Sequence, residues 1–129
     1  MDAKELRHGN LVYTKHVITC KYSNVRKVSN TIMVNFEREN DYLKPIPIAE
    51  DRLLEFGFIR DFSHYVGGEF EYSKPDCVIE YSKPDCVIDM DMNLIYICSN
   101  DGSVESKCKT PKYLHQLQNL YFSKTNKEL

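Results

Sequence analysis

Residues 70–109 read FEYSKPDCVIEYSKPDCVIDMDMNLIYICSNDGSVESKCK, and the turn signals in this stretch decide the fold. Short runs rich in β-branched and aromatic residues alternate with Lys-Pro-Asp, with Met-Asp-Met-Asn and with Asn-Asp-Gly. This punctuation is typical of short antiparallel strands joined by tight reversals. We therefore expect antiparallel strands over residues 58–109.

Residues 71–88 contain the sequence EYSKPDCVI twice without one difference. Proline suits the first corner of a type I turn and aspartate the second, so each copy predicts a reversal followed by Cys-Val-Ile. Nine is an odd number, so in one unbroken strand Cys77 and Cys86 would point to opposite faces. We expect one copy to keep the strand and the other to project as an edge strand or loop, open to a partner or to self-association. A tolerated slippage duplication is the alternative.

A short helix is expected just before this sheet, at residues 49–57. Pro45 and Pro47 keep the preceding chain extended, acidic residues fill the first helical turn, and Gly57 ends the helix. We expect the nearby large apolar side chains to face the core. They are Leu53, Leu54, Phe56, Phe58 and Ile59.

The carboxyl end predicts a second helix over residues 110–124, with Thr110 as its cap and Pro111 in its first turn. Apolar residues recur there at three- and four-residue spacing, which predicts a core-facing stripe. The stripe comprises Tyr113, Leu114, Leu117, Leu120 and Tyr121. We expect His115, Gln116 and Gln118 on the polar side or its edge, with the histidine tucked in.

The amino-terminal part, residues 1–48, reads as a bent, barrel-like β-unit. Residues 12–22 and 31–37 are rich in β-branched and aromatic residues, and Ser-Asn pairs lie between them. The chain thus predicts a single α+β domain over residues 1–129. It combines this β-unit, the short central helix, and an antiparallel sheet with the carboxyl-terminal helix packed on it.

Three stretches resemble small phage- and prophage-encoded proteins: AKELRHGNLV at 3–12, PIPIAEDRLLEFGF at 45–58, and KYLHQLQNLYFSKTNKEL at 112–129. The last is the most specific of the three. Ala49 stands where such proteins often carry a Ser or Thr helix cap, and the repeat at 71–88 is not part of their pattern. The resemblance brings no established chemistry, so no catalytic residue follows from it.

Composition limits the function classes. The five cysteines form no C-x-x-C pair and the four histidines are scattered, so we expect free thiols, no metal and no cofactor. The most apolar run, LIYIC at 94–98, is too short to span a bilayer. The amino-terminal residues MDAKELRHGN do not read as a secretory signal. We expect a cytoplasmic protein without a membrane partner.

Pro84-Asp85 with Glu105-Ser106-Lys107 could be read as the PD…ExK pattern of restriction-type nucleases, in which two carboxylates hold Mg²⁺. The string Asn-Asp-Gly stands where an apolar strand should precede the glutamate, and the Pro-Asp pair is already explained as a turn. We therefore expect no enzyme, and keep a nuclease as the second alternative.

Charge is distributed unevenly along the chain. Residues 1–48 carry eight Lys or Arg and five Asp or Glu, residues 49–105 carry four and thirteen, and residues 106–129 carry five and one. An acidic surface with tyrosines repels nucleic acid and attracts basic protein grooves. We expect the partner to bind Tyr72, Asp76, Glu80, Tyr81, Asp85, Asp89 and Asp91.

Defence nucleases and RNA-guided CRISPR effectors have basic channels, so the favoured function is a non-enzymatic, phage-type inhibitor of such a host protein. The first alternative is an accessory protein that binds nucleic acid through the basic amino-terminal β-unit, where lysines and arginines lie among tyrosines. The residues concerned are Tyr13, Lys15, Lys21, Tyr22, Arg26 and Lys27.

Overall fold

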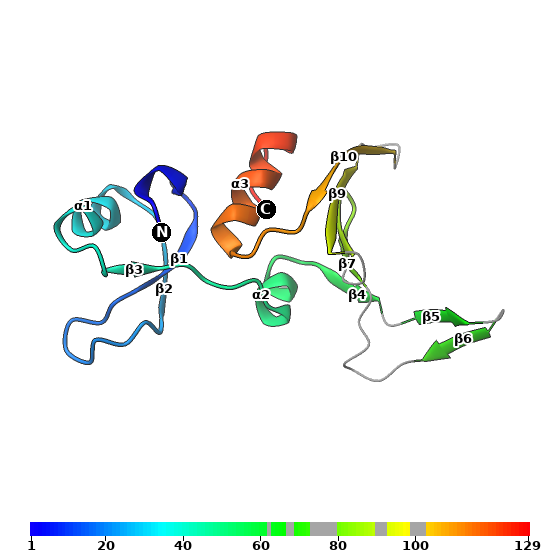
Figure 1. The fold of residues 1–129 in the computed structure, drawn as a ribbon, viewed down its shortest axis with the longest axis horizontal. Coiled ribbons are helices and arrows are strands. Elements are labelled where there is room, and N and C mark those ends of the chain that lie inside the picture. The colour runs from blue at the N-terminus through cyan, green and yellow to red at the C-terminus, as the bar shows by residue number, and fades with distance from the viewer. Residues whose placement is uncertain (62, 67–68, 73–79, 90–92, 99–102) are drawn as a thin grey trace. The chain divides into compact units, whose positions relative to one another are not determined.

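A computed structural model describes residues 1–61, 63–66, 69–72, 80–89, 93–98 and 103–129. Its internal contacts divide the chain into two compact units. The first unit comprises Met1–Ile48 and Pro111–Leu129, and the second comprises Ala49–Thr110. Helices and antiparallel sheets occur together, which confirms the α+β class (Figure 1). The single domain and its barrel-like β-unit stay predictions.

The first unit contains a three-stranded antiparallel sheet in the order β2-β1-β3. Its strands are β1 (Leu11–Thr14), β2 (Asn24–Lys27) and β3 (Leu43–Lys44). The expected strand over 12–22 is therefore wrong beyond Thr14. The chain turns there because His16 Nδ1 accepts the N–H groups of Ile18 and Thr19, at 3.3 and 3.2 Å.

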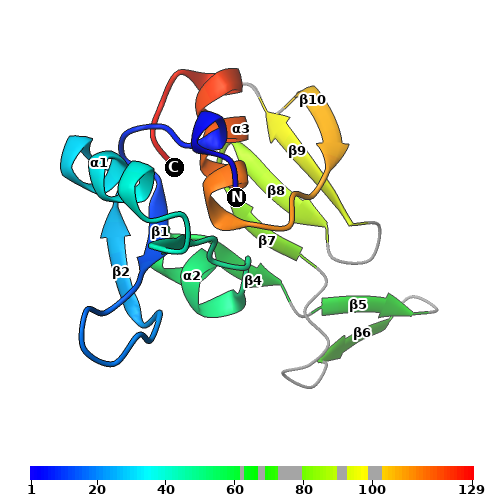
Figure 2. The same ribbon diagram turned by 60° about the vertical axis from the view of Figure 1, so that its left-hand side comes forward.

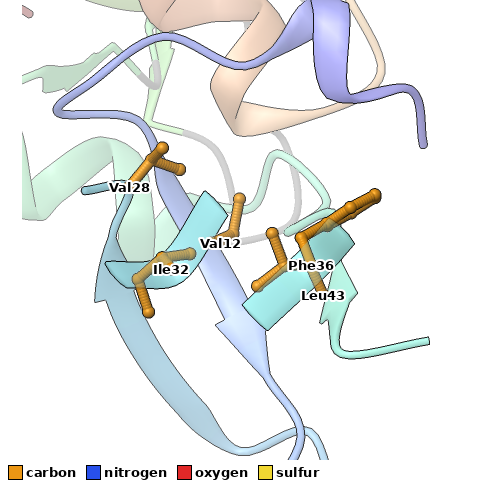
Figure 3. Packing of buried hydrophobic residues seen from close by; sticks show 5 residues of the cluster. All are labelled: Val12, Val28, Ile32, Phe36 and Leu43. Carbon is orange, nitrogen blue, oxygen red and sulfur yellow. The ribbon is translucent and has the colours of Figure 1, made fainter. Parts of the chain in front are cut away.

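The expectation of a strand over 31–37 is also wrong, because α1 occupies Asn30–Arg38. The side chain of Ser29 caps this helix by accepting the Ile32 N–H at 3.4 Å. Ile32 and Phe36 stand four residues apart, so both reach the core from one face of the helix. The buried cluster consists of Val12, Val28, Ile32, Phe36 and Leu43 (Figure 3).

The carboxyl-terminal helix α3 runs over Leu114–Thr125 and belongs to the first unit. It begins after Tyr113 rather than Thr110, because the Tyr113 N–H donates to Oε1 of Gln116 at 3.1 Å. The N–H of Leu114 donates to the carbonyl of Ile46 at 2.8 Å, which fixes the start of the helix against residues 46–47.

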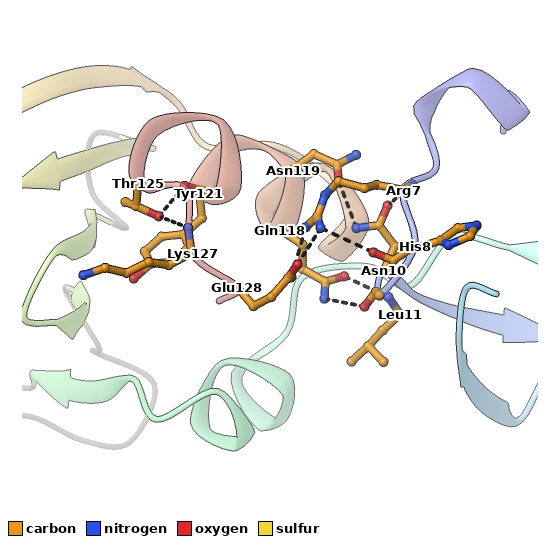
Figure 4. A network of polar contacts seen from close by, with 11 residues as sticks. Arg7, His8, Asn10, Leu11, Gln118, Asn119, Tyr121, Thr125, Lys127 and Glu128 are labelled. Carbon is orange, nitrogen blue, oxygen red and sulfur yellow. Dashed lines mark hydrogen bonds and ion pairs between the residues drawn. The ribbon is translucent and has the colours of Figure 1, made fainter.

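Polar side chains of α3 connect this helix to the amino-terminal residues of the first unit, and its expected packing on the second sheet stays a prediction. Gln118 Oε1 accepts the Leu11 N–H at 2.8 Å, and Asn119 Oδ1 accepts from Asn10 Nδ2 at 2.9 Å (Figure 4). His115 is buried, with Nε2 3.2 Å from Oε2 of Glu5. The tucked histidine is thus confirmed, but the expected exposure of Gln118 is wrong, since it lies buried among these partners.

The short amino-terminal helix η1 (Ala3–Glu5) lies in the same unit. Arg7 follows it and pairs with Glu128 through its two terminal guanidinium nitrogens, at 2.5 and 3.0 Å (Figure 4). Its guanidinium also lies over the Phe122 ring, 4.0 Å from the centroid. Residues near both ends of the first unit's sequence are thereby connected.

The second unit begins with α2 (Glu50–Glu55), which confirms the central helix. Its N-cap Ala49 supplies no side-chain bond, and Gly57 ends it with a φ of +88°. Leu53 and Phe58 are buried as expected. Leu54 and Ile59 are not, being 39% and 70% exposed. The inward placement of Leu54 was wrong because a six-residue helix turns only part of its surface to the core. That of Ile59 was wrong because it lies on β4 opposite the half-buried Ser82.

The five-stranded sheet of this unit has the order β10-β9-β8-β7-β4, and every neighbouring pair is antiparallel (Figure 2). A separate hairpin joins β5 to β6. The sheet strands are β4 (Ile59–Asp61), β7 (Glu80–Lys83), β8 (Cys86–Asp89), β9 (Leu94–Cys98) and β10 (Val104–Lys109). The hairpin strands are β5 (Ser63–Val66) and β6 (Glu69–Tyr72).

The second copy of the repeat forms one hairpin of the sheet. Residues 80–88 run through β7, a turn at Pro84-Asp85, and most of β8. This confirms the turn predicted from Lys-Pro-Asp. The first copy begins in β6, and its residues 73–79 lie outside the described residues. The projecting edge or loop expected from that copy stays a prediction.

Candidate protein-binding surface

The two faces of the five-stranded sheet differ in burial. Residues directly opposite on neighbouring antiparallel strands share a face, and the row Tyr81–Ile88–Ile95 is buried. Residues one position away point to the other side, which we call the outer face. Residues on this face that are exposed or only half-buried include Ile59, Glu80, Ser82, Val87, Asp89, Leu94, Tyr96 and Lys107.

Two carboxylates lie together on the outer face. Glu80 on β7 stands directly opposite Asp89 on β8, and both are half-buried. Like charges in this position repel each other, so a cationic group placed over the pair would be attracted by both. Glu80 and Asp89 each also interact with another group of the protein, and together they place negative charge on the outer face.

A mostly apolar stripe, interrupted by Ser82, runs across the strands beside this acidic pair. Ile59 pairs with Ser82, Ser82 with Val87, and Val87 with Tyr96. Ile59 is 70% exposed, although large aliphatic side chains are usually buried. Nζ of Lys107 lies 5.8 Å from the Tyr96 ring centroid at the far end of the stripe. Apolar anchors beside charge are the composition expected of a protein interface.

The second unit as a whole is acidic, like the carboxylate pair on its outer face. Residues 49–110 carry six Lys or Arg and thirteen Asp or Glu, a net charge of −7. The first unit carries eleven and six, a net charge of +5. The basic ends of the sequence thus belong largely to one unit and the acidic middle to the other.

The structure brings two of the seven expected contact residues together, Glu80 and Asp89. Asp85 is half-buried in the turn before β8, where its carbonyl accepts the Cys98 N–H at 2.9 Å. Tyr72 ends β6, paired with Ser63. Asp76 and Asp91 lie outside the described residues.

Tyr81 lies on the buried face of the sheet. It is 6% exposed, and burial, followed by the nearby charge of Glu50, raises the pKa of its phenol. The alternation along β7 turns Tyr81 to the side opposite Glu80, and its expected role in partner binding stays a prediction.

Sequence reasoning missed the apolar members of the outer face, namely Ile59, Val87 and Tyr96. Cys-Val-Ile and Leu-Ile-Tyr-Ile-Cys read as continuous apolar runs, so composition does not say which residues face outward. Side chains two positions apart on a strand point to the same face, and this alternation would have placed Val87 beside Asp89.

The residues of the nuclease pattern are divided between a turn and a strand of the second unit. Asp85 precedes β8, Glu105 and Lys107 lie on β10, and β9 stands between these strands. Glu105 falls at an irregularity in the β10–β9 ladder. Within the described residues, no group of three His, Cys, Asp or Glu side chains could hold a metal ion. The absence of enzymatic activity stays a prediction.

Part of the expected basic surface is neutralised within the first unit. Nζ of Lys15 donates to Glu39 and Asp41 at 3.0 and 2.8 Å. These bonds raise the pKa of Lys15 and lower that of Asp41. The Tyr22 hydroxyl also bonds the Asp41 carbonyl. Lys21, Arg26 and Lys27 are exposed.

Comparisons with protein-family models, curated proteins and solved structures found no match to this chain. In the part of the chain that the structure describes, no helix has the length and apolar character needed to cross a membrane.

Proposed function

We propose that the protein is a non-enzymatic, phage-type binding protein whose acidic outer face docks on a basic surface of a host protein. The observation that carries the proposal is the Glu80–Asp89 pair beside the stripe of Ile59, Val87 and Tyr96 on one sheet face. The carboxylates supply steering and orientation, and the apolar stripe supplies area to bury.

A host defence nuclease or RNA-guided CRISPR effector is the partner class we propose. Such proteins hold nucleic acid in positively charged channels, which an acidic surface complements. A protein that covers the channel would inhibit cleavage by exclusion, without chemistry of its own. The host cytoplasm is the corresponding place of action.

The test measures inhibition of purified defence nucleases and RNA-guided effectors on a labelled DNA target. The double variant Glu80→Lys/Asp89→Lys should weaken inhibition about tenfold to a hundredfold, because two attractive contacts become repulsive. The matched control Glu37→Lys/Asp51→Lys changes the net charge equally at exposed helix positions and should inhibit normally. Circular dichroism must show that both variants are folded.

The apolar stripe provides a second arm. Ile59→Ser removes an exposed aliphatic side chain without charge change and should weaken inhibition by about tenfold. Equal inhibition by wild type, the acidic-pair variant and Ile59→Ser would refute the proposed surface. Failure of the wild-type protein to inhibit any member of a broad panel would refute the partner class.

A second candidate function is supported by one face of the first unit's sheet. Tyr13 on β1 stands between Lys44 on β3 and Val25 on β2, and Nζ of Lys44 lies 4.1 Å from the Tyr22 ring centroid. Aromatic rings among lysines can stack bases and contact phosphates of a single strand. Binding of labelled single-stranded DNA or RNA that falls steeply with salt would favour this function.

A further inference from the structure

A cavity of about 430 Å³ lies within the first unit, at the open side of strand β2. Its volume is in the range of sites that hold a small molecule or a partner's side chain. Strand β2, helix α1 and the loop after β1 all contribute to its walls. The lining includes Val17, Ile18, Asn24, Arg26, Ile32 and Asn35.

Strand β2 forms one edge of its sheet, since among the described strands it pairs with β1 alone. The Val28 N–H donates to the Asn10 carbonyl at 2.8 Å, just beyond the ladder. Hydrogen-bonded pairs alternate along an antiparallel ladder. The backbone groups of Arg26 and Asn24 therefore face β1, and those of Val25 and Lys27 face the open edge. An open edge can accept a further strand.

The side chains around the cavity indicate which strand would fit. Val17 and Ile18 line it and are nevertheless 91% and 85% exposed, so a chain lying there would cover them. Arg26 also lines the cavity and is exposed, and its guanidinium forms no hydrogen bond or ion pair with any described residue. The surrounding unit carries a net charge of +5. Aliphatic surface beside an uncompensated guanidinium fits an apolar side chain next to a carboxylate.

We propose that β2 binds an extended acidic peptide segment of a partner protein as a fourth strand of the sheet. Asn24 and Arg26 are two positions apart and project to the cavity side. A paired strand presents its own side chains with the same period. The recognised pattern is therefore an aliphatic residue, any residue, then Asp or Glu. The aliphatic side chain fills the cavity, and the carboxylate pairs with Arg26.

This site is independent of the acidic outer face, since it uses the other unit and binds the opposite charge. The two surfaces could serve two partners, or two parts of one partner. Loss of either surface leaves the residues of the other unchanged, so their tests remain separate.

The probe is a fluorescein-labelled peptide, Ser-Gly-Thr-Ile-Thr-Asp-Thr-Ser, titrated with the full-length protein by fluorescence anisotropy. We expect saturable binding, and binding at least about tenfold weaker for peptides with Ile replaced by Ser or Asp replaced by Lys. Arg26→Glu should weaken binding of the original peptide at least about tenfold. Arg38→Glu makes the same charge change at an exposed position of α1 and should bind as wild type.

Two variants of Lys27 test whether backbone hydrogen bonds of β2 contribute to peptide binding. Lys27→Ala and Lys27→Pro remove the same charge, but only proline removes the outward N–H, a change that edge strands tolerate. We expect Lys27→Pro to bind more weakly than Lys27→Ala, with equal far-ultraviolet circular dichroism. The proposal is overturned by absence of saturable binding, by wild-type affinity in Arg26→Glu, or by equal affinity in the two Lys27 variants. Self-association in sedimentation that Arg26→Glu abolishes would instead assign the edge to a second copy of the chain.

Discussion

Replacing Gln118 by Met should destabilise the first unit, although the two side chains are similar in length and methionine suits an apolar core. Gln118 is buried on α3 and bridges to the amino-terminal loop. Its Oε1 accepts the Leu11 N–H at 2.8 Å, and its Nε2 donates to the Gly9 carbonyl at 3.3 Å. Methionine can form neither bond.

The expected loss of stability can be estimated from the backbone groups that lose their hydrogen-bond partner. A buried donor without a partner costs about 1–3 kcal/mol, and the longer bond to Gly9 contributes about 0.5–1 kcal/mol. The better transfer of methionine into the core offsets part of this loss. We expect a net loss of about 2 kcal/mol in the free energy of unfolding, which is large for a domain of ordinary stability.

Urea denaturation followed by circular dichroism measures this loss, with the slope of the transition compared to confirm that the same surface unfolds. Lys124→Met is the control, because it places the same side chain at an exposed position of the same helix and should change stability by less than about 0.5 kcal/mol. A Gln118→Met variant as stable as this control would refute the reasoning that polar contacts of α3 hold the amino-terminal loop.

Three further experiments test other parts of the structure. Ser29→Ala removes the cap of α1 and should cost about 1 kcal/mol in urea unfolding; no cost would question the helix. Burial raises the pKa of Cys86 to about 12, so mass-mapped labelling should modify exposed Cys20 rapidly and Cys86 only after unfolding. The hydrogen bond from Arg7 lowers the pKa of Glu128 below its ordinary 4.5. The pair therefore stabilises the folded protein above pH 4.5, and this stability is lost as the pH falls through the lowered pKa of the folded state. Arg7→Met should remove this part of the pH dependence of the melting temperature, and an unchanged pH profile would contradict the assignment.

The sequence predicted an element correctly where residues within that element mark its beginning and its end. Glu50 and Asp51 in the first turn and Gly57 at the end predicted the central helix, and the Pro84-Asp85 turn predicted the hairpin of the second repeat copy. These features depend on backbone dihedrals and on the helix dipole, which involve only nearby residues.

Composition misled where the same residues suit two kinds of element. Residues 31–37 contain β-branched and aromatic side chains, which favour a strand. The helix forms because Ser29 caps it and because Ile32 and Phe36, one turn apart, meet the same buried cluster. Packing against a core outweighs such weak local preferences.

The sequence by itself determined the α+β class, the antiparallel strands of residues 80–109 and the concentration of acid in the middle of the chain. Only the tertiary structure decided that α3 joins the amino-terminal residues, that Tyr81 is buried, and that Glu80 stands directly opposite Asp89. The physical reason is that side-chain facing depends on strand register, and the partner of a helix depends on contacts with residues more than a hundred positions away, such as the Gln118–Leu11 bond. Neither is encoded in any short stretch of residues.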